Sequence, residues 1–292
     1  MPAPRGARLY GQGMTATIAL NDGTSIPQLG FGTYLVPPQD TQAIVGTALE
    51  VGYRHIDTAQ MYGNEAEVGR AVAESGLSRG ELYLTSKLDN GNHRPDDVRR
   101  TFAESLARLG VDRLDLFLIH WPLPTLYDGD YVSTWQAVAG LIEEGTLRSA
   151  GVSNFEPEHL DRIIGETGVV PAVNQIEVHP YFPNERARAA SLSHGIAVEA
   201  WGPLGQGAVL GDEVIAGIAE RTGRPPAQVI LRWHIQRGDI VFPKSSSRAR
   251  MEENSRIFDF DLSPQDMAAI DGLDQGPQGR GGPDPNTFAY LP

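Results

Sequence analysis

Cysteine is absent from the 292-residue chain, which excludes disulfides, thiolate catalysis and cysteine-based metal sites and is compatible with the cytoplasmic location we expect. A continuous apolar run of about 18 residues is also missing, so the sequence predicts no membrane span. Positive charge is scarce, because 24 lysines and arginines face 37 aspartates and glutamates, for a formal net charge of −13. That charge repels phosphate backbones and argues against a nucleic-acid partner.

The first residues, MPAPRGARLYGQGM, lack the apolar central stretch of a secretory signal. We expect residues 1–14 to form a flexible leader. No low-complexity tract or shift in composition divides the remainder, so we expect residues 15–292 to form a single domain. Nothing in the sequence indicates an obligate hydrophobic interface, and a monomer is therefore expected.

Short apolar runs alternate with helix-period segments along the chain. The expected strands are Leu29–Thr33, Tyr53–Asp57, Leu82–Lys87, Leu114–His120, Leu147–Val152, Ala172–Gln175, Ala197–Trp201 and Ile240–Pro243. The expected helices are Thr41–Val51, Glu65–Glu74, Pro95–Leu109, Val132–Glu144, Pro157–Gly165, Glu185–Ser193, Pro225–Gln236 and Arg248–Ile257. Repeats of roughly 30 residues predict an α/β fold, the (β/α)8 TIM barrel. A doubly wound open sheet is the rival, but its glycine-rich G-x-G-x-x-G fingerprint does not occur here.

Three local features complete the expected fold. The segment Thr17–Pro27 surrounds Asn21-Asp22-Gly23 and predicts an N-terminal β-hairpin, a plug or a lid for the barrel. Asn64 precedes the helix that begins at Glu65 and is expected to cap it. The glycine- and proline-rich residues 276–292 predict a C-terminal loop.

Polar side chains stand where several of the expected strands end. They are Asp57, Lys87, His120, Ser153, Asn154 and Gln175. Because the carboxyl ends of barrel strands meet at one face, where catalysis takes place in barrel enzymes, these side chains are expected to lie together. Packing alone does not explain hydrogen-bonding groups at the ends of five buried strands.

Tyr62 lies five residues after Asp57 and is placed to fold back over the same face. A phenol titrates near ~10, and a neighbouring Lys87 would favour the phenolate and lower that value. Asp57 would hold the ammonium of Lys87, and His120 would orient a substrate oxygen or relay a proton. Each residue alone has a structural explanation, His120 as a core histidine and Asp57 as a helix cap. Together they predict general acid catalysis.

Several motifs resemble those of the aldo-keto reductase family, in the branch typified by bacterial 2,5-diketo-D-gluconate reductases. They are GYRHIDTAQMYGNEAEVG, LTSKL, LFLIHWP, GVSNF, VNQIEVHPY and FPKSSSRARMEEN, in the family's order and spacing. The resemblance runs from Asn21 to about Phe288. It implies an NADPH-dependent oxidoreductase that reduces aldehyde or ketone carbonyls of small molecules to alcohols.

The resemblance also implies a role for individual residues. Tyr62 would be the proton donor, Lys87 and Asp57 its tuning pair, and His120 the substrate orienter. NADPH/NADP+ would bind along Ser153, Asn154, Gln175, Trp201, Leu204, Gly205 and Gln206. Trp201 stands where relatives often have Tyr, and both side chains offer a flat face for stacking.

A basic patch follows the last expected strand and balances the acidic character of the chain. It comprises Lys244, Ser245, Ser246, Arg248 and Arg250, and cations at a helix start favour an anionic ligand. The family pattern assigns Lys244, Ser245 and Arg250 to the 2′-phosphate of NADPH and Glu253 and Asn254 to its adenine. A solvated basic helix start is the structural alternative.

Tyr34, Trp121 and the tail around Phe288 are expected to frame the substrate pocket, although packing is an equally good explanation for each. Relatives often have Trp in the loop after the third expected strand, whereas this chain has Leu88-Asp89-Asn90. The family pattern therefore does not predict the shape of the pocket at this loop. Two other functions are alternatives. One is a cofactor-sensing module without turnover, which the presence of all four of Asp57, Tyr62, Lys87 and His120, the tetrad, argues against. The other is a metal-dependent hydrolase, for which no H-E-x-x-H pair is present.

Overall fold

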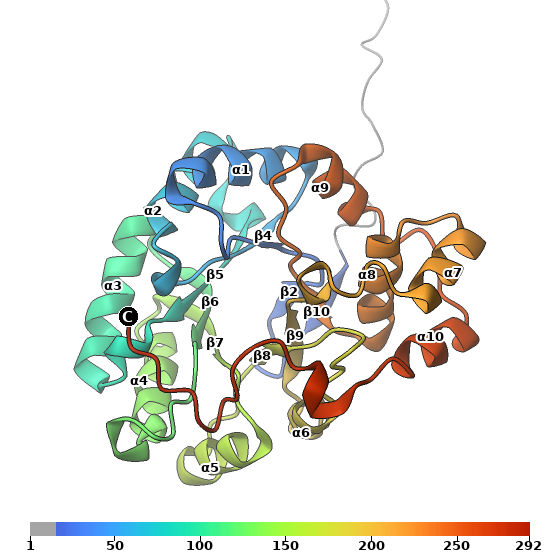
Figure 1. Cartoon of the computed structure of the whole chain (residues 1–292). Coiled ribbons are helices and arrows are strands. Elements are labelled where there is room, and N and C mark those ends of the chain that lie inside the picture. The colour runs from blue at the N-terminus through green and yellow to red at the C-terminus, as the bar shows by residue number, and fades with distance from the viewer. Residues whose placement is uncertain (1–15) are drawn as a thin grey trace, which may run out of the picture.

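Eight short parallel strands form the centre of the computed structural model, which describes residues 16–292 (Figure 1). They are β3 Phe31–Gly32, β4 His55–Asp57, β5 Tyr83–Leu88, β6 Leu114–Ile119, β7 Leu147–Ser153, β8 Val173–Glu177, β9 Ala197–Trp201 and β10 Ile240–Val241. Neighbours in the sheet follow the order β10-β9-β8-β7-β6-β5-β4-β3. The predicted leader, residues 1–14, lies outside the described residues.

The two edge strands, β3 and β10, meet and close the ring. Leu29 pairs in parallel with Val241, the Gly30 amide donates to the Val241 carbonyl at 2.7 Å, and the Val241 amide donates to the Gln28 carbonyl at 3.0 Å. Closure leaves few backbone groups of the sheet unpaired, which a short-stranded open sheet could not achieve. The predicted TIM barrel is confirmed, and each of the eight expected strand segments overlaps one of its strands, although β5, β7 and β8 end one or two residues later than expected.

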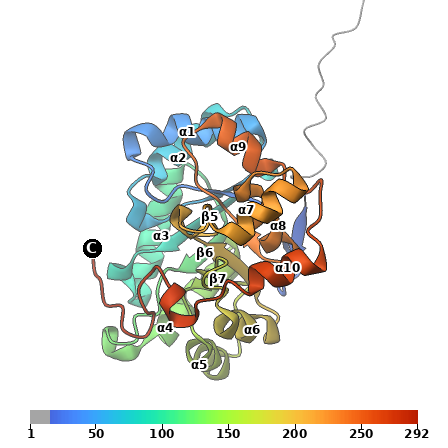
Figure 2. The same cartoon turned by 45° about the vertical axis from the view of Figure 1, so that its right-hand side comes forward.

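Helices surround the strands on the outside (Figure 1). They are α1 Pro38–Val51, α2 Glu65–Glu74, α3 Pro95–Leu109, α4 Tyr131–Glu143, α5 Pro157–Thr167, α6 Glu185–Ser193, α7 Glu213–Thr222, α8 Pro226–Arg237, α9 Arg248–Ser255 and α10 Pro264–Asp271. The expected helices did not include α7 and α10, which pack together beside α8 (Figure 2). Both begin at a capping residue, Asp212 and Ser263, and this signal could have revealed them.

Helix α3 illustrates how the sequence builds the outer layer. Pro95 occupies its first turn, where no backbone hydrogen bond is lost, and Gly110 ends it in the left-handed conformation with φ of 66°. Val98, Phe102 and Leu109 recur at helical spacing and are buried. Their face lies on the sheet, where the rings of Phe102 and Phe117 meet edge to face at 4.9 Å.

The predicted hairpin is a plug rather than a lid. Strands β1 Thr17–Ala19 and β2 Ser25–Pro27 pair antiparallel and cover the amino-terminal end of the barrel. Leu20 and Ile26 pack with inward-facing residues near the starts of the strands, among them Tyr83 and Leu116. The plug seals the end of the barrel opposite the face where the polar strand ends meet.

The prediction that the Asn64 side chain caps α2 is wrong. The side chain of Asn64 makes no capping hydrogen bond to α2. It accepts from the Thr58 hydroxyl at 2.9 Å and donates to the carbonyls of Thr33 and Val36 at 3.1 and 3.2 Å. Complete burial explains the difference, because Asn64 satisfies loop carbonyls that water cannot reach.

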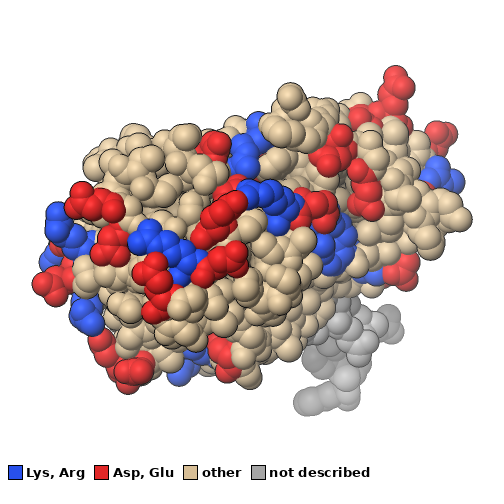
Figure 3. All heavy atoms as spheres, turned by 90° about the horizontal axis from the view of Figure 1, so that it is seen from below, with Lys and Arg blue, Asp and Glu red and all other residues tan. Residues whose placement is uncertain are grey.

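The surface of the described residues carries both signs of charge. Figure 3 shows one face on which lysines and arginines are interspersed with aspartates and glutamates. Several oppositely charged side chains on the surface pair with a neighbour on the same helix, and Arg100 of α3, for example, pairs with Asp97 and Glu104. Within residues 16–292, no helix has the length and apolar character needed to cross a membrane.

We expect Ile26→Ala to lower the free energy of unfolding by about 2–5 kcal/mol, because it leaves a cavity between the plug and the barrel. Ile26 is completely buried. Urea unfolding measures the loss, and Ile18→Ala, at a half-buried position of the same hairpin, serves as the control with a smaller expected loss. Equal losses in the two variants would show that the hairpin does not seal the barrel as described.

Candidate active site

An ion pair lies inside the barrel between β4 and β5. Asp57 is the last residue of β4, and its Oδ1 accepts from the Lys87 ammonium of β5 at 2.6 Å. Neither side chain is reached by solvent to any extent, with 0% and 2% exposure for Lys87 and Asp57. Burial alone lowers the pKa of Lys87, but Asp57 and Tyr62 more than offset this, and the pKa ends above its usual value. Lys87 is therefore a permanent cation in the folded protein.

Tyr62 is brought to this pair by a 3-10 turn, Gln60–Tyr62, that follows β4. Lys87 Nζ lies 3.3 Å from Tyr62 Oη and also donates to the Thr58 carbonyl at 3.0 Å. Burial raises the pKa of Tyr62 to about 12, while the charge of Lys87 acts in the opposite direction. Lys87 lowers this pKa, as predicted from the sequence, but desolvation of the phenol has the larger effect and the net shift is upward. The phenol consequently keeps its proton at neutral pH.

His120 follows β6 directly, and its ring meets that of Tyr62 edge to face at 5.8 Å. Burial, followed by the charge of Lys87, holds the pKa of His120 well below its usual value, so the imidazole is neutral. The Asn154 amide donates to the His120 carbonyl at 2.9 Å and fixes the backbone there. Within residues 16–292, the buried Nδ1 of His120 has no hydrogen-bond partner.

Beneath the Lys87–Asp57 pair lies a layer of polar side chains, of which only Gln175 was predicted from the sequence. Gln175 reaches across the barrel from β8, and its Nε2 donates to Asp57 Oδ2 at 2.9 Å and to Glu199 Oε2 at 2.8 Å. Burial, followed by the charge of Asp57, raises the pKa of Glu199 to about 8. His55 lies 3.8 Å from Glu199, and burial lowers its pKa to about 4, because burial disfavours the charged form of a base as it does that of an acid.

Glu199 and His55 were missed because both stand within expected strands rather than at their ends. A charged or titratable residue in the middle of a strand buried on both sides is itself a signal, since such residues are rarely buried without a partner. Applied to Ala197–Trp201, this rule would have identified Glu199 from the sequence.

Polar groups beside the tetrad bond to one another at the ends of β7 and β9. Ser153 Oγ donates to the Gln175 carbonyl at 2.8 Å, and the Asn154 amide donates to Ser153 Oγ at 3.1 Å. The Trp201 indole donates to Asn154 Oδ1 at 2.8 Å, which holds its ring at the mouth of the barrel. Asn154 adopts a left-handed conformation with φ of 62°, so its side chain turns back toward His120. The structure brings Ser153, Asn154, Gln175 and Trp201 together.

Leu204, Gly205 and Gln206 form the loop after β9. Gln206 is exposed, and both it and Gly205 have positive φ, 52° and 54°. A side chain at Gly205 would come within 2.8 Å of Val209, so the tight turn requires glycine there. Leu204 packs on the core and anchors the start of this loop.

The two expected pocket aromatics flank the tetrad. Tyr34 is 56% exposed, and its ring lies 5.1 Å from that of Tyr62. Trp121, next to His120, is buried beneath the tail residue Phe288, with ring centroids 4.3 Å apart. The Asn90 amide donates to the Tyr290 carbonyl at 3.0 Å, so the loop after β5, which lacks the Trp often found in relatives, contacts the tail.

The tail, residues 276–292, crosses the carboxyl-terminal face from α10 toward α3 (Figure 1). Glu177, the last residue of β8, accepts hydrogen bonds from the Gly281 and Gly282 amides at 2.7 and 3.0 Å. A side chain at Gly282 would come within 2.5 Å of the Trp201 ring. This contact was not predicted, because nothing in the local sequence links Glu177 to residues about a hundred positions later.

The basic patch is divided by the structure. Arg248, at the start of α9, pairs with Glu50 at 2.6 Å and Glu252 at 3.2 Å. Within residues 16–292, neither Lys244 nor Arg250 forms an ion pair, and both are exposed. Ser245 is buried and accepts from the Ser247 amide at 3.1 Å, while Ser246 is exposed.

The expected adenine residues lie one turn further along α9. Glu253 is half-buried, and its carbonyl accepts from Gln228 at 2.7 Å. Asn254 is buried against the barrel. No group of three or more His, Asp or Glu side chains suited to a metal ion occurs in the part of the chain that the structure describes.

These features define a TIM-barrel enzyme with a buried lysine–aspartate pair beside a tyrosine and a neutral histidine. Residues 28–275 match the model of the Aldo/keto reductase family, and the chain belongs to this family. An aldo-keto reductase of Mycolicibacterium smegmatis is 53% identical over 278 residues, 95% of this chain and 100% of that relative. The Methylglyoxal reductase DkgA of Escherichia coli is 42% identical, over 93% of this chain and 97% of its own length.

Solved structures agree with the sequence relatives. A mutant of Gox0644 crystallised in complex with NADPH superposes with a TM-score of 0.90 at 45% identity, covering 94% of this chain and 99% of that one. The family predicted from the motifs and its enzyme class are therefore confirmed.

We expect Glu199→Gln to change how stability depends on pH. Folding raises the pKa of Glu199 from 4.5 to about 8, so the folded protein binds the extra proton between these values. The contribution of Glu199 to the free energy of unfolding therefore falls as pH rises through this window. Glutamine mimics the protonated carboxyl. The free energy of unfolding of the variant, measured in urea, should therefore increase relative to that of the wild type as pH rises from 4.5 to about 8. A difference that does not vary with pH would contradict the assigned protonation.

Proposed function

We propose that the protein reduces aldehyde or ketone carbonyls of small molecules to alcohols with NADPH as the hydride donor. One observation carries this proposal. The Tyr62 hydroxyl lies 3.3 Å from the Lys87 ammonium, which is itself held 2.6 Å from Asp57 at the carboxyl-terminal face of the barrel. This is a protonated acid beside a permanent cation, which suits proton donation to an oxygen that gains negative charge.

The residues beside the tetrad fit a nicotinamide. Trp201 offers a flat indole at the mouth of the barrel. The N–H and O–H donors of Ser153, Asn154 and Gln175 bond within the protein, and their side-chain oxygens keep acceptor capacity for the NH2 group of a carboxamide. Leu204, Gly205 and Gln206 form the adjoining loop, where the pyrophosphate would lie. When bound, NADPH supplies the hydride.

The exposed cations after β10 fit the 2′-phosphate of NADPH. Lys244 and Arg250 form no ion pair with an acidic side chain within residues 16–292, whereas Arg248 pairs with Glu50 and Glu252. Ser245 and Ser246 add hydroxyls, and charge-assisted bonds from arginine to phosphate are strong. Glu253 and Asn254, on the same helix, would contact the adenine.

The tetrad divides the work of the reaction. Tyr62 donates its proton to the carbonyl oxygen as that oxygen becomes an alkoxide. Lys87 stabilises the phenolate that is left, and Asp57 fixes the Lys87 ammonium in position. Neutral His120 orients the carbonyl with a hydrogen bond, and its low pKa keeps it from competing as the acid. Tyr34 and Trp121 frame the substrate above this group.

A similar relative is called a methylglyoxal reductase, so a 2-oxoaldehyde belongs among the first substrates to test. The monomeric state, the cytoplasmic location and the single domain over residues 15–292 stay predictions.

We expect Tyr62→Phe to lower kcat by about 10²–10⁴-fold, the range for removing a positioned general acid, while NADPH still binds. The loss of NADPH absorbance with a panel of aldehydes, 2-oxoaldehydes and ketones measures turnover, and quenching of protein fluorescence measures binding. Wild-type turnover in Tyr62→Phe, or no turnover by the wild type on any member of the panel, would refute the proposal.

We expect Arg250→Ala to weaken NADPH binding by about 1.5–3 kcal/mol and to leave NADH binding nearly unchanged, because only NADPH carries the 2′-phosphate. Arg248→Ala is the matched control, since this arginine is exposed on the same helix but already bonded to Glu50 and Glu252. Fluorescence titration with both nucleotides measures the effect. An equal loss for both would show that Arg250 does not bind this phosphate.

A further inference from the structure

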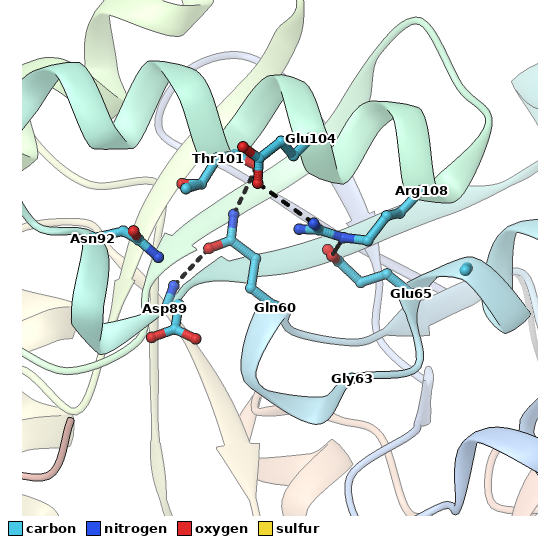
Figure 4. A pocket seen from close by; sticks show the side chains of 9 residues that line it. Gln60, Gly63, Glu65, Asp89, Asn92, Thr101, Glu104 and Arg108 are labelled. Atoms are coloured by element: carbon cyan, nitrogen blue, oxygen red, sulfur yellow. Dashed lines mark hydrogen bonds and ion pairs between the residues drawn. The ribbon is translucent and has the colours of Figure 1, made fainter. Parts of the chain in front are cut away.

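A cavity of about 290 Å³ lies outside the barrel, directly behind the turn that carries Tyr62 (Figure 4). Its lining comes from that turn, from the start of α2, from the loop after β5 and from α3. The residues that line it include Gln60, Glu65, Asp89, Asn92 and Arg108. These side chains bond mainly to one another and to the backbone around them, as the dashed lines in Figure 4 show.

Gln60 opens the 3-10 turn and uses its whole amide to bind neighbouring elements. Its Nε2 donates to the Thr101 carbonyl and to Ser105 Oγ of α3, both at 3.0 Å. Its Oε1 accepts from the Asp89 amide at 2.8 Å, in the loop that follows Lys87 by two residues. One side chain therefore ties the turn of Tyr62 to α3 and to the end of β5.

Glu65 makes a parallel connection from the other side of Tyr62. Its buried carboxylate accepts from Ser86 Oγ at 2.6 Å, and Ser86 is the neighbour of Lys87 on β5. It also accepts from Arg108 Nε at 2.7 Å and from Ser105 Oγ at 3.3 Å, both on α3. Ser105 is thus shared by the Gln60 and Glu65 connections.

The turn needs such support because it is short. A 3-10 turn has poor hydrogen-bond geometry, and this one is closed by bonds of 3.1 and 3.3 Å. It ends at Gly63, which has φ of 66° and no side chain to pack. Part of the Tyr62 side chain is exposed even though its hydroxyl is desolvated beside Lys87, so packing does not enclose the whole side chain.

We propose that Gln60 and Glu65 are positioning residues that set the separation of Tyr62 Oη and Lys87 Nζ by anchoring both to helix α3. The proposal rests on Tyr62 being the proton donor. Catalytic groups must be held within about 0.5 Å of their productive geometry, and small displacements cost up to about 10²-fold in rate. A loosened anchor therefore reduces the rate of chemistry without removing a group that contacts the substrate or NADPH.

Gln60→Met tests the proposal, because methionine keeps the length of the side chain and removes its hydrogen bonds. We expect kcat to fall about 10- to 100-fold, with KM and the Kd for NADPH within about two-fold of the wild type. The primary isotope effect with deuterated NADPH should increase, since the chemical step becomes more rate-limiting. Asn92→Ala is the matched control, because Asn92 lines the same cavity but its amide oxygen bonds only to Arg100, at 3.3 Å, within residues 16–292.

A double-mutant cycle separates positioning from general destabilisation. If Gln60 acts through Tyr62, Gln60→Met causes no further loss of kcat in the Tyr62→Phe background. Losses that multiply, or an unchanged kcat in Gln60→Met alone, would overturn the proposal. Wild-type turnover in Tyr62→Phe would instead refute the proposed function itself. Should Gln60→Met fail to fold, Glu65→Gln takes its place in the same cycle, with the same expected outcomes.

Discussion

The buried bond between Lys87 and Asp57 is the constraint around which the rest of the barrel interior is arranged. Taking an ammonium out of water costs several kcal/mol, which only a close counter-charge and further hydrogen bonds offset. The sheet supplies both, because Asp57 stands opposite Thr85 in the pairing of β4 with β5, and Lys87 lies two residues further on the same inward face. A shift in register by one residue would turn Lys87 outward and remove the pair.

The titratable groups around this pair are kept without charge, so the barrel interior holds one fixed dipole rather than a fluctuating set of ions. Burial holds the pKa of His120 well below its usual value and raises the pKa of Glu199 to about 8. Gln175 lies between Glu199 and Asp57 and donates a hydrogen bond to one oxygen of each. A field of this kind is preorganised, since no solvent has to reorient when charge develops on a bound oxygen.

Most of the fold and most of the candidate site followed from local sequence patterns. Short apolar runs marked the strands, and strand order then placed Asp57, Lys87 and His120 at one face. What escaped prediction depends on burial and on contacts between distant segments. The pKa of Tyr62 rises because desolvation of the phenol outweighs the effect of the Lys87 charge. The Asn64 side chain bonds to a distant loop rather than to the helix that it precedes. Arg248 forms an ion pair with Glu50. None of these outcomes can be judged until the neighbours are known in three dimensions.

Hydrogen bonds from the Gly281 and Gly282 amides to Glu177 hold the tail across the barrel face, although the tail comes from the opposite end of the chain from the tetrad. The tetrad is contained in the first half of the chain, whereas the wall at Trp121 is contributed by Phe288, near its end. The tail that covers Trp121 is therefore the last part of the chain to be synthesised, and Trp121 stays uncovered until Phe288 has been made. A substitution at Phe288 would therefore alter the covering of Trp121 without changing Asp57, Tyr62, Lys87 or His120.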